Sequence, residues 1–335
     1  MPLPLILAVP ALIGLAGYGA KKGLNARRDN KAARRTRSEA NQIQKGAEQS
    51  LTTNRQQTTK SLEKLGLLKL ELWENELARF VDLFEQIKRV ELSGASQAQG
   101  LTSTSFIRNE LGKMKTVSTF AKEALSGGAT AIGTGALVGI AGYGGTTMFA
   151  AASTGTAISS LSGVAATNAT LAWLGGGSLA AGGFGMAGGV AVLGGIVAAP
   201  VIALGGHFLA AQARKNLAEA KAHKATAKKA AAELKSASAV LRGIRKVSVK
   251  YTQLLSELKP RFSEVVDELE QTIDTHGFDY SAYPDTAKNK VYLAVQFAMC
   301  MKTVIDTPIM NQSGALSPKY KHGLEKGGSF LKALQ

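Results

Sequence analysis

The most unusual feature of this sequence is a missing class of residue. The chain has 40 Lys and Arg and 24 Asp and Glu, yet none of them lies between Ala124 and Ala213. A globular surface carries charged side chains at short intervals, so a stretch of this length without any is either buried on all sides or in contact with lipid. We call residues 124–213 the uncharged block.

Chemically reactive residue types are also scarce. The single cysteine, Cys300, excludes an intramolecular disulfide, and its apolar surroundings (VYLAVQFAMCMKTVI) predict a packed thiol rather than a nucleophile. A GxGxxG match at Gly183, Gly185 and Gly188 is not followed by the acidic residue that a dinucleotide site needs. No metal-ligand spacing links the four histidines, which are His207, His223, His276 and His322. We therefore expect no enzyme, no cofactor and no metal site.

The uncharged block is rich in small residues and holds 22 of the 37 glycines. A bilayer-spanning helix needs about 20 apolar residues, and two segments have that length, Met186–Leu209 and Ala129–Ala152. A turn at GGGS (175–178) would join them into a helical hairpin, with Pro200 as a kink and Val197 in the second arm. Pairs of glycine four apart, which permit close helix packing, are Gly135 with Gly139 and Gly185 with Gly189.

Two other interpretations of the uncharged block remain open beside membrane contact. The block could be the buried core of a large soluble helical bundle, or a flexible low-complexity segment. His207, the one histidine inside it, would on the membrane hypothesis lie at the interface or act as a pH-sensitive gate.

Basic residues flank both apolar regions of the chain. Residues 21–37 carry eight Lys or Arg against one Asp, and residues 214–250 carry 11 basic and two acidic side chains. This pattern favours anionic lipid headgroups as the partner and a cytoplasmic location for the basic parts. Nucleic acid is the alternative partner, although the Lys/Ala-rich stretch offers no aromatic residue for base stacking. The candidate headgroup contacts are Lys21, Lys22, Arg27, Arg28, Arg214, Lys215, Lys221, Lys224, Lys228 and Lys229.

The first 20 residues form another uncharged apolar stretch. Its basic residues follow the apolar run rather than precede it, so we expect no cleavable signal peptide. The segment is either a short membrane anchor or an apolar helix that inserts only within an assembly.

Apolar residues in steps of three and four predict long amphipathic helices on both sides of the block. We expect an all-α fold, with helices near 34–92 and 208–273 running antiparallel, a helix at 105–125, a kink or helix break near Lys259 caused by Pro260, and one C-terminal helix around 291–305. The predicted regions are 1–20, 21–123, 124–213, 214–275 and 276–335. The helix seams include Leu70, Trp73, Leu77, Phe80, Phe84, Leu241, Ile244, Tyr251, Leu255 and Leu258.

An apolar Gly/Ala hairpin between long amphipathic helices resembles the α-helical pore-forming toxins, the colicin channel domains and the membrane-inserting region of apolipoprotein L. The segments that carry this resemblance are GALVGIAGYGG, WLGGGSLAAGGFGMAGG and VAVLGGIVAAPVIALGG. It implies insertion into a bilayer, assembly into a homo-oligomer and permeabilisation. The competing hypothesis is a membrane-anchored helical scaffold that binds a protein partner.

Overall fold

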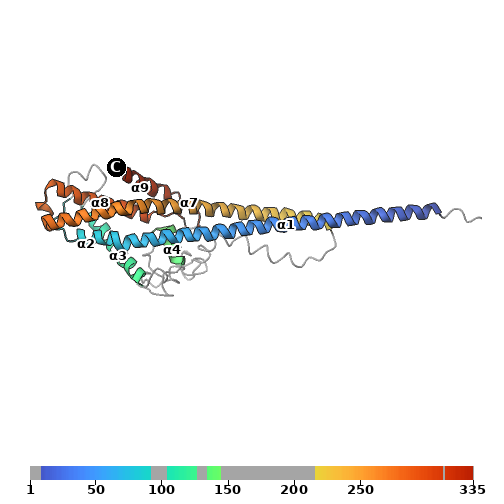
Figure 1. Cartoon of the computed structure of the whole chain (residues 1–335), viewed down its shortest axis with the longest axis horizontal. Coiled ribbons are helices and arrows are strands. Elements are labelled where there is room, and N and C mark those ends of the chain that lie inside the picture. Colours follow the sequence, from blue (N-terminus) through green and yellow to red (C-terminus); the bar gives the residue numbers. More distant parts are fainter. Residues whose placement is uncertain (1–8, 92–103, 127–133, 145–215, 312–313, 335) are drawn as a thin grey trace, which may run out of the picture. The chain divides into compact units, whose positions relative to one another are not determined.

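The computed structural model describes residues 9–91, 104–126, 134–144, 216–311 and 314–334. These residues are helical, as expected, and two isolated β-bridges, Lys88 with Asp279 and Met310 with Leu316, do not extend into strands within the described ranges. The helices are α1 (Val9–Leu72), a π-helical turn (Trp73–Leu77), α2 (Ala78–Phe84), α3 (Thr104–Ser126), α4 (Thr134–Tyr143), α7 (Asn216–His276), a 3-10 turn (Tyr280–Ala282), α8 (Asp285–Asp306) and α9 (Tyr320–Ala333), as Figure 1 shows.

The chain divides into two compact units, and α1 and α7 contribute to both. The first unit comprises Met1–Thr53 and Ala199–Ala239, and the second comprises Asn54–Ala198 and Val240–Gln335. The shorter helices α2, α3, α4, α8 and α9 all belong to the second unit. The second unit therefore contains α4, the described helix of the uncharged block.

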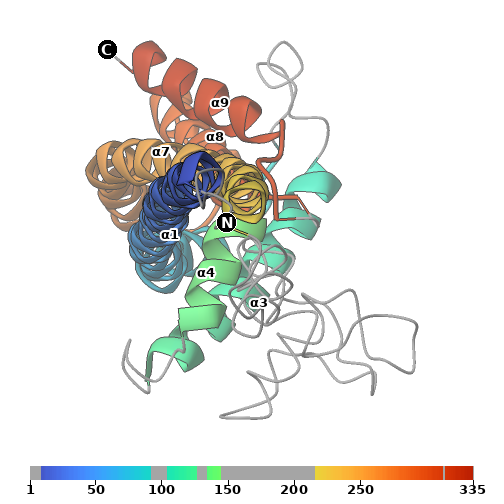
Figure 2. The same ribbon diagram turned by 90° about the vertical axis from the view of Figure 1, so that its right-hand side faces the viewer.

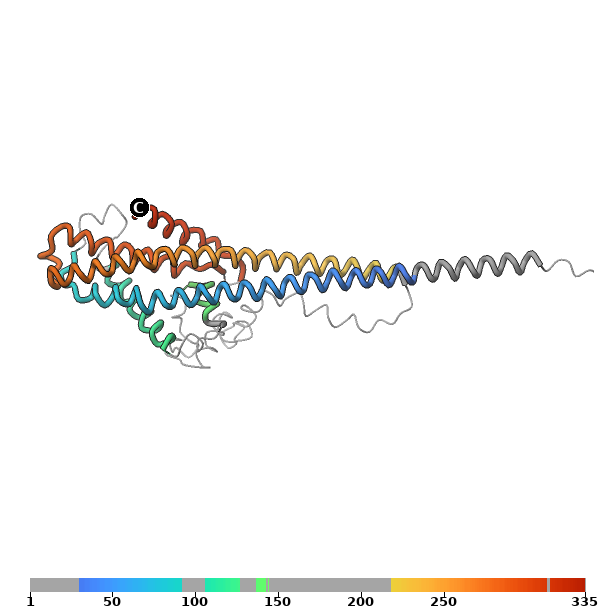
Figure 3. The backbone as a smooth tube through the Cα atoms, in the orientation of Figure 1, coloured from blue at the N-terminus to red at the C-terminus, as the bar shows by residue number. Residues whose placement is uncertain are grey.

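Within each unit, α1 and α7 run in the same direction. Residue numbers rise together along the two helices, as Figure 3 shows. Side-chain contacts join Arg37 to Glu219 and Glu39 to Lys224 in the first unit, and Thr58 to Leu241 and Ser61 to Ser248 in the second. Arg79 of α2, which follows α1 in the chain, continues this order with Asp267. The antiparallel prediction is wrong because it rested on apolar periodicity, which shows the buried face of each helix but not the direction in which a neighbouring helix runs.

Alanine forms most of the helix contact in the first unit. The buried alanines are Ala33, Ala40 and Ala47 on α1 and Ala220, Ala227, Ala230 and Ala231 on α7. Hydrophobic stabilisation scales with apolar area, at about 25 cal/mol per Å², and alanine has little area to bury. Each contact in this unit therefore stabilises the helix pair less than the leucine and phenylalanine contacts of the second unit do.

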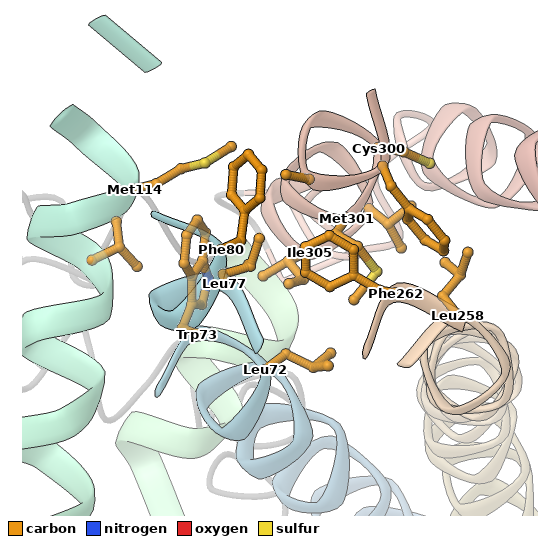
Figure 4. Close-up of a cluster of buried hydrophobic side chains, with 14 of the residues drawn as sticks. Leu72, Trp73, Leu77, Phe80, Met114, Leu258, Phe262, Cys300, Met301 and Ile305 are labelled. Carbon is orange, nitrogen blue, oxygen red and sulfur yellow. The ribbon is translucent and has the colours of Figure 1, made fainter. Parts of the chain in front are cut away.

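The residues of the predicted seams are buried. Every seventh residue of α7 from Ala220 to Leu269 is buried, which is the spacing expected of a helix that keeps one stripe against its neighbours. All ten seam residues named from the sequence are buried, including Trp73 and Tyr251. Figure 4 shows Trp73, Leu77 and Phe80 beside Met114 of α3, with Phe262 of α7 and Ile305 of α8 in the same cluster.

Pro260 does not break α7, so of the two outcomes expected near Lys259, a kink or a break, the break does not occur. The helix is continuous from Asn216 to His276 with Pro260 inside it. A proline removes the hydrogen bond to the carbonyl four residues earlier, here that of Ser256. Pro260 and Ser256 are both exposed, so water can satisfy the unpaired carbonyl. The cost of the proline is lower on this face than it would be in the core.

Helix α9 was not predicted, and it packs through glycine. In Figure 2 it is stacked on α8, and the rings of Phe297 and Phe330 join the two helices with centroids 4.8 Å apart. A Cβ atom at Gly323 would press on Thr307, and one at Gly327 would press on Leu254. Glycine thus allows α9 to lie closer to its neighbours than any other residue would.

Candidate functional site

The predicted membrane-inserting residues are only partly within the described chain. Gly135 and Gly139 belong to α4, and Gly139 is buried. Gly185, Gly189, Val197 and Pro200 lie outside the described residues, as does the predicted span Met186–Leu209.

Helix α4 is much shorter than the predicted span Ala129–Ala152. It has ten residues and ends at Tyr143, where Gly144 adopts a φ of +92°. A left-handed glycine directly after the last turn is a common helix terminator. At 1.5 Å per residue, α4 is about 15 Å long, half of the roughly 30 Å hydrocarbon core. Across the described ranges, no helix is both long and apolar enough to cross a membrane.

The apolar side chains of α4 are buried in the second unit. Leu137, Val138, Ile140 and Ala141 are each at most 9% exposed and belong to the hydrophobic core cluster. In this structure these four residues therefore lie in a protein core, which was the alternative to lipid contact in the sequence analysis. The uncharged composition of α4 fits a core segment and a membrane segment equally well.

Glycine on α1 allows α4 to come close. A Cβ atom at Gly66 would overlap the carbonyl group of Leu137, so a residue larger than glycine at position 66 would force the backbones apart. At the other end of α4, a Cβ at Gly144 would overlap the carbonyl oxygen of Asp306. Backbone packs against backbone at both places, and neither partner can move as a flexible side chain could.

Three carbonyl groups at the C-terminus of α4 are capped from outside the helix. Lys69 Nζ donates to the carbonyl oxygens of Ile140 at 3.5 Å and Ala141 at 3.2 Å. The backbone amides of Ile309 and Met310 both donate to the carbonyl of Gly142 at 2.8 Å. The last carbonyls of a helix lack partners within the helix, so these donors satisfy them. We call Gly66, Lys69, Ile309 and Met310 the α4 seat.

Lys69 is the unusual member of the α4 seat because its charged group is completely buried. Its relative exposure is 0%, and burial lowers the pKa of the amine to about 7, while nearby Asp306 acts in the opposite direction. The Nζ atom also lies 5.8 Å from the centre of the Tyr251 ring. Within the described chain no carboxylate forms a salt bridge with Lys69, so the α4 carbonyls are its direct hydrogen-bond partners. A helix C-terminus carries partial negative charge, which favours a cation there.

A polar network borders the α4 seat and joins α3 to α8. Lys302 lies 3.2 Å from Glu110 and 2.8 Å from Asp306, and Lys113 contacts Glu110 at 2.6 Å. Burial alone would raise the pKa of Glu110, but hydrogen bonds from Lys113 and Lys302 outweigh it and lower the pKa. Glu110 is therefore ionised at neutral pH and joins α3 to α8 through Lys302.

The predicted headgroup residues fall into three groups. Lys221, Lys228 and Lys229 are exposed on α7, as lipid contact requires, whereas Lys224 forms an ion pair with Glu39. For four others the structure gives only a position in α1: Lys21, Lys22, Arg27 and Arg28. The last two, Arg214 and Lys215, lie outside the described residues.

Within the described residues, the single cysteine is buried and no cluster of metal ligands is found. Cys300 is buried, and burial raises the pKa of its thiol to about 11, which makes it a packing residue as predicted. No group of three or more His, Cys, Asp or Glu in the described ranges could hold a metal ion. Comparison with protein-family models, with curated proteins and with solved structures finds no match to this chain.

Proposed function

We propose that this chain is a non-enzymatic, membrane-inserting helical protein that assembles with copies of itself and forms or lines a pore. The observation that carries the proposal is the uncharged block, 90 residues without Asp, Glu, Lys or Arg. A charged residue at the centre of a membrane helix costs about 2.5 to 3.5 kcal/mol on insertion scales. The block contains no such residue.

The surface of the first unit supports the same proposal. Lys221, Lys228 and Lys229 point away from the alanine contact and are exposed on α7. Each Lys or Arg near an anionic membrane surface contributes about 1 kcal/mol of attraction. These lysines would bring the chain to anionic lipid before the uncharged block inserts, with the basic helices on the cytoplasmic side.

The test compares two identical substitutions at different places. Val197→Arg puts a charge into the predicted second span, whereas Val249→Arg puts the same charge on α7 at a valine that is 43% exposed. Wild type and Val249→Arg should release dye from anionic vesicles and remain with the membrane after carbonate washing. Val197→Arg should lose both properties while its circular dichroism still shows the long helices.

Three results would contradict the proposal. Equal carbonate-resistant partition of all three proteins would show that the block does not insert around residue 197. Membrane binding without dye release by wild type would favour the anchored scaffold over the pore. Salt-sensitive retention on DNA without vesicle binding would instead favour the nucleic-acid alternative.

A further inference from the structure

We propose that the α4 seat is a latch: α4 must leave Gly66, Lys69, Ile309 and Met310 before the first half of the uncharged block can form a membrane span. The proposal rests on the membrane-inserting function above. It adds the residues that hold the chain in its uninserted form, and it follows from a competition for the Gly142 carbonyl at the end of α4.

Helix elongation and docking use the same acceptors. An α-helix that continued past Tyr143 would donate the amides of residues 144, 145 and 146 to the carbonyls four residues earlier. Those carbonyls belong to Ile140, Ala141 and Gly142, which now accept from Lys69, Ile309 and Met310. The Gly142 carbonyl already accepts two hydrogen bonds, one for each lone pair. Docked α4 therefore cannot extend past its present C-terminus unless Gly142 gives up a hydrogen bond to Ile309 or Met310.

The conformation of Gly144 is part of the same obstacle. Its φ of +92° turns the chain out of the helix beside the carbonyl oxygen of Asp306. Elongation needs a helical φ near −63° at this residue, and that change would redirect the chain away from its present contact with Asp306. Docking thus fixes both the end point of α4 and the direction of the residue after it.

The protonation of the Lys69 amine depends on whether α4 is docked. While α4 is docked, the amine is sealed from water and its pKa is held near 7. The groups around it are Tyr251 from α7, Asp306 and Lys302 from α8, and Glu110 behind Lys302 from α3. Departure of α4 would remove its carbonyls and admit water, so the amine would regain an ordinary pKa and take up a proton.

A reversible disulfide tests whether α4 has to leave. A Cβ atom at residue 142 would lie 3.6 Å from Met310 Cγ, which is close to where a cysteine sulfur at 310 would lie. The variant Gly142→Cys/Met310→Cys in a Cys300→Ala background therefore suits a cross-link with little movement. We expect the oxidised protein to release dye from anionic vesicles at least about tenfold more slowly than the same protein after reduction. Equal release rates, with the cross-link confirmed by mass spectrometry, would overturn the proposal.

A second measurement tests the seat without any membrane. In a Val138→Cys/Cys300→Ala protein the new thiol replaces a side chain that is 6% exposed, so maleimide labelling reports release of α4. Gly66→Ala should speed labelling about tenfold or more, because the added methyl overlaps the Leu137 carbonyl. The matched control is Gly46→Ala, on the same helix with nothing within 4 Å of the added Cβ, and it should leave the rate unchanged.

The two measurements separate the latch from the function on which it rests. Unchanged labelling in Gly66→Ala would show that the Gly66 contact does not hold α4, and the latch would be wrong. Faster labelling in Gly66→Ala, with no dye release by any variant or by wild type, would confirm the seat and refute the membrane function.

Discussion

Replacing Lys69 by methionine should make the second unit more stable at pH 6 and less responsive to pH. The lowering of the Lys69 pKa from 10.5 to about 7 means that the charged amine is disfavoured by roughly 5 kcal/mol in the folded chain. Methionine has a similar length and no charge, but it leaves the Ile140 and Ala141 carbonyls without that donor, at a cost of about 1 to 3 kcal/mol. The expected gain at pH 6 is therefore about 2 to 4 kcal/mol in the free energy of unfolding.

The pH dependence identifies Lys69 as the cause. Between about pH 7 and 10.5 the unfolded chain holds a proton on Lys69 that the folded chain has lost, so the stability of wild type rises with pH in this range. Below pH 7 both states are protonated and this contribution is constant. The advantage of Lys69→Met should thus shrink by about 3 kcal/mol from pH 6 to pH 9. Tyr251, Asp306, Lys302 and Glu110 are present in both proteins, so the difference between them reports the removed amine.

Urea unfolding at pH 6, 7.5 and 9 measures the effect. A Trp173→Phe background leaves Trp73 as the only tryptophan, and its side chain is 1% exposed in the core of the second unit. Lys64→Met, an exposed position on the same helix, is the control and should follow the wild-type curve. Parallel stability curves for wild type and Lys69→Met would refute the argument, since they would show that the buried amine does not titrate between pH 7 and 10.5.

Two further predictions concern lipid binding and assembly. Changing Lys221, Lys228 and Lys229 to Gln should weaken binding to anionic but not neutral vesicles, and high salt should have the same effect on wild type. The control of equal charge changes Lys60, Lys64 and Lys250 to Gln, and equal loss in both triple variants would remove any special role for Lys221, Lys228 and Lys229. Gly185→Leu with Gly189→Leu should preserve membrane partition, because both changes are apolar, yet reduce the cross-linked oligomer and dye release. Wild-type oligomer and leakage in this double variant would show that these glycines do not organise the assembly.

The helices and their buried stripes could be predicted because both depend on local periodicity. Leu241, Ile244, Tyr251, Leu255 and Leu258 follow steps of three and four, and all five are buried. Such a pattern says which face of a helix is covered. It does not say which helix covers it or in which direction that helix runs, and the direction of α7 was therefore predicted wrongly.

The burial of Lys69, one member of the α4 seat, could have been predicted from the sequence. Lys69 continues the inward steps of Leu62 and Leu65 toward Leu72, so the same periodicity places this lysine in the core. A lysine on an apolar stripe is rarely buried without a partner, which could have marked the position. Its partners, the carbonyls at the end of α4, could not be predicted because they depend on where α4 ends and where it docks.

Helix α9 and Pro260 show where local rules fail for tertiary reasons. Glycine weakens an isolated helix by about 1 kcal/mol per residue, so the glycines of α9 argued against a helix. Contacts at Gly323 and Gly327 that only glycine permits offset that cost. At Pro260 the lost hydrogen bond falls on the exposed face of α7, and the helix tolerates it.

Lipid-phase quenching at residue 197 tests the central claim most directly. A fluorophore would be attached to Val197→Cys, and for comparison to Val249→Cys, each in a Cys300→Ala background and mixed with anionic vesicles that carry a quencher on their acyl chains. We expect strong quenching at 197 and none at 249, which is an exposed position of α7. Equal, weak quenching at both positions would show that the uncharged block does not enter the hydrocarbon around residue 197, and would contradict the account.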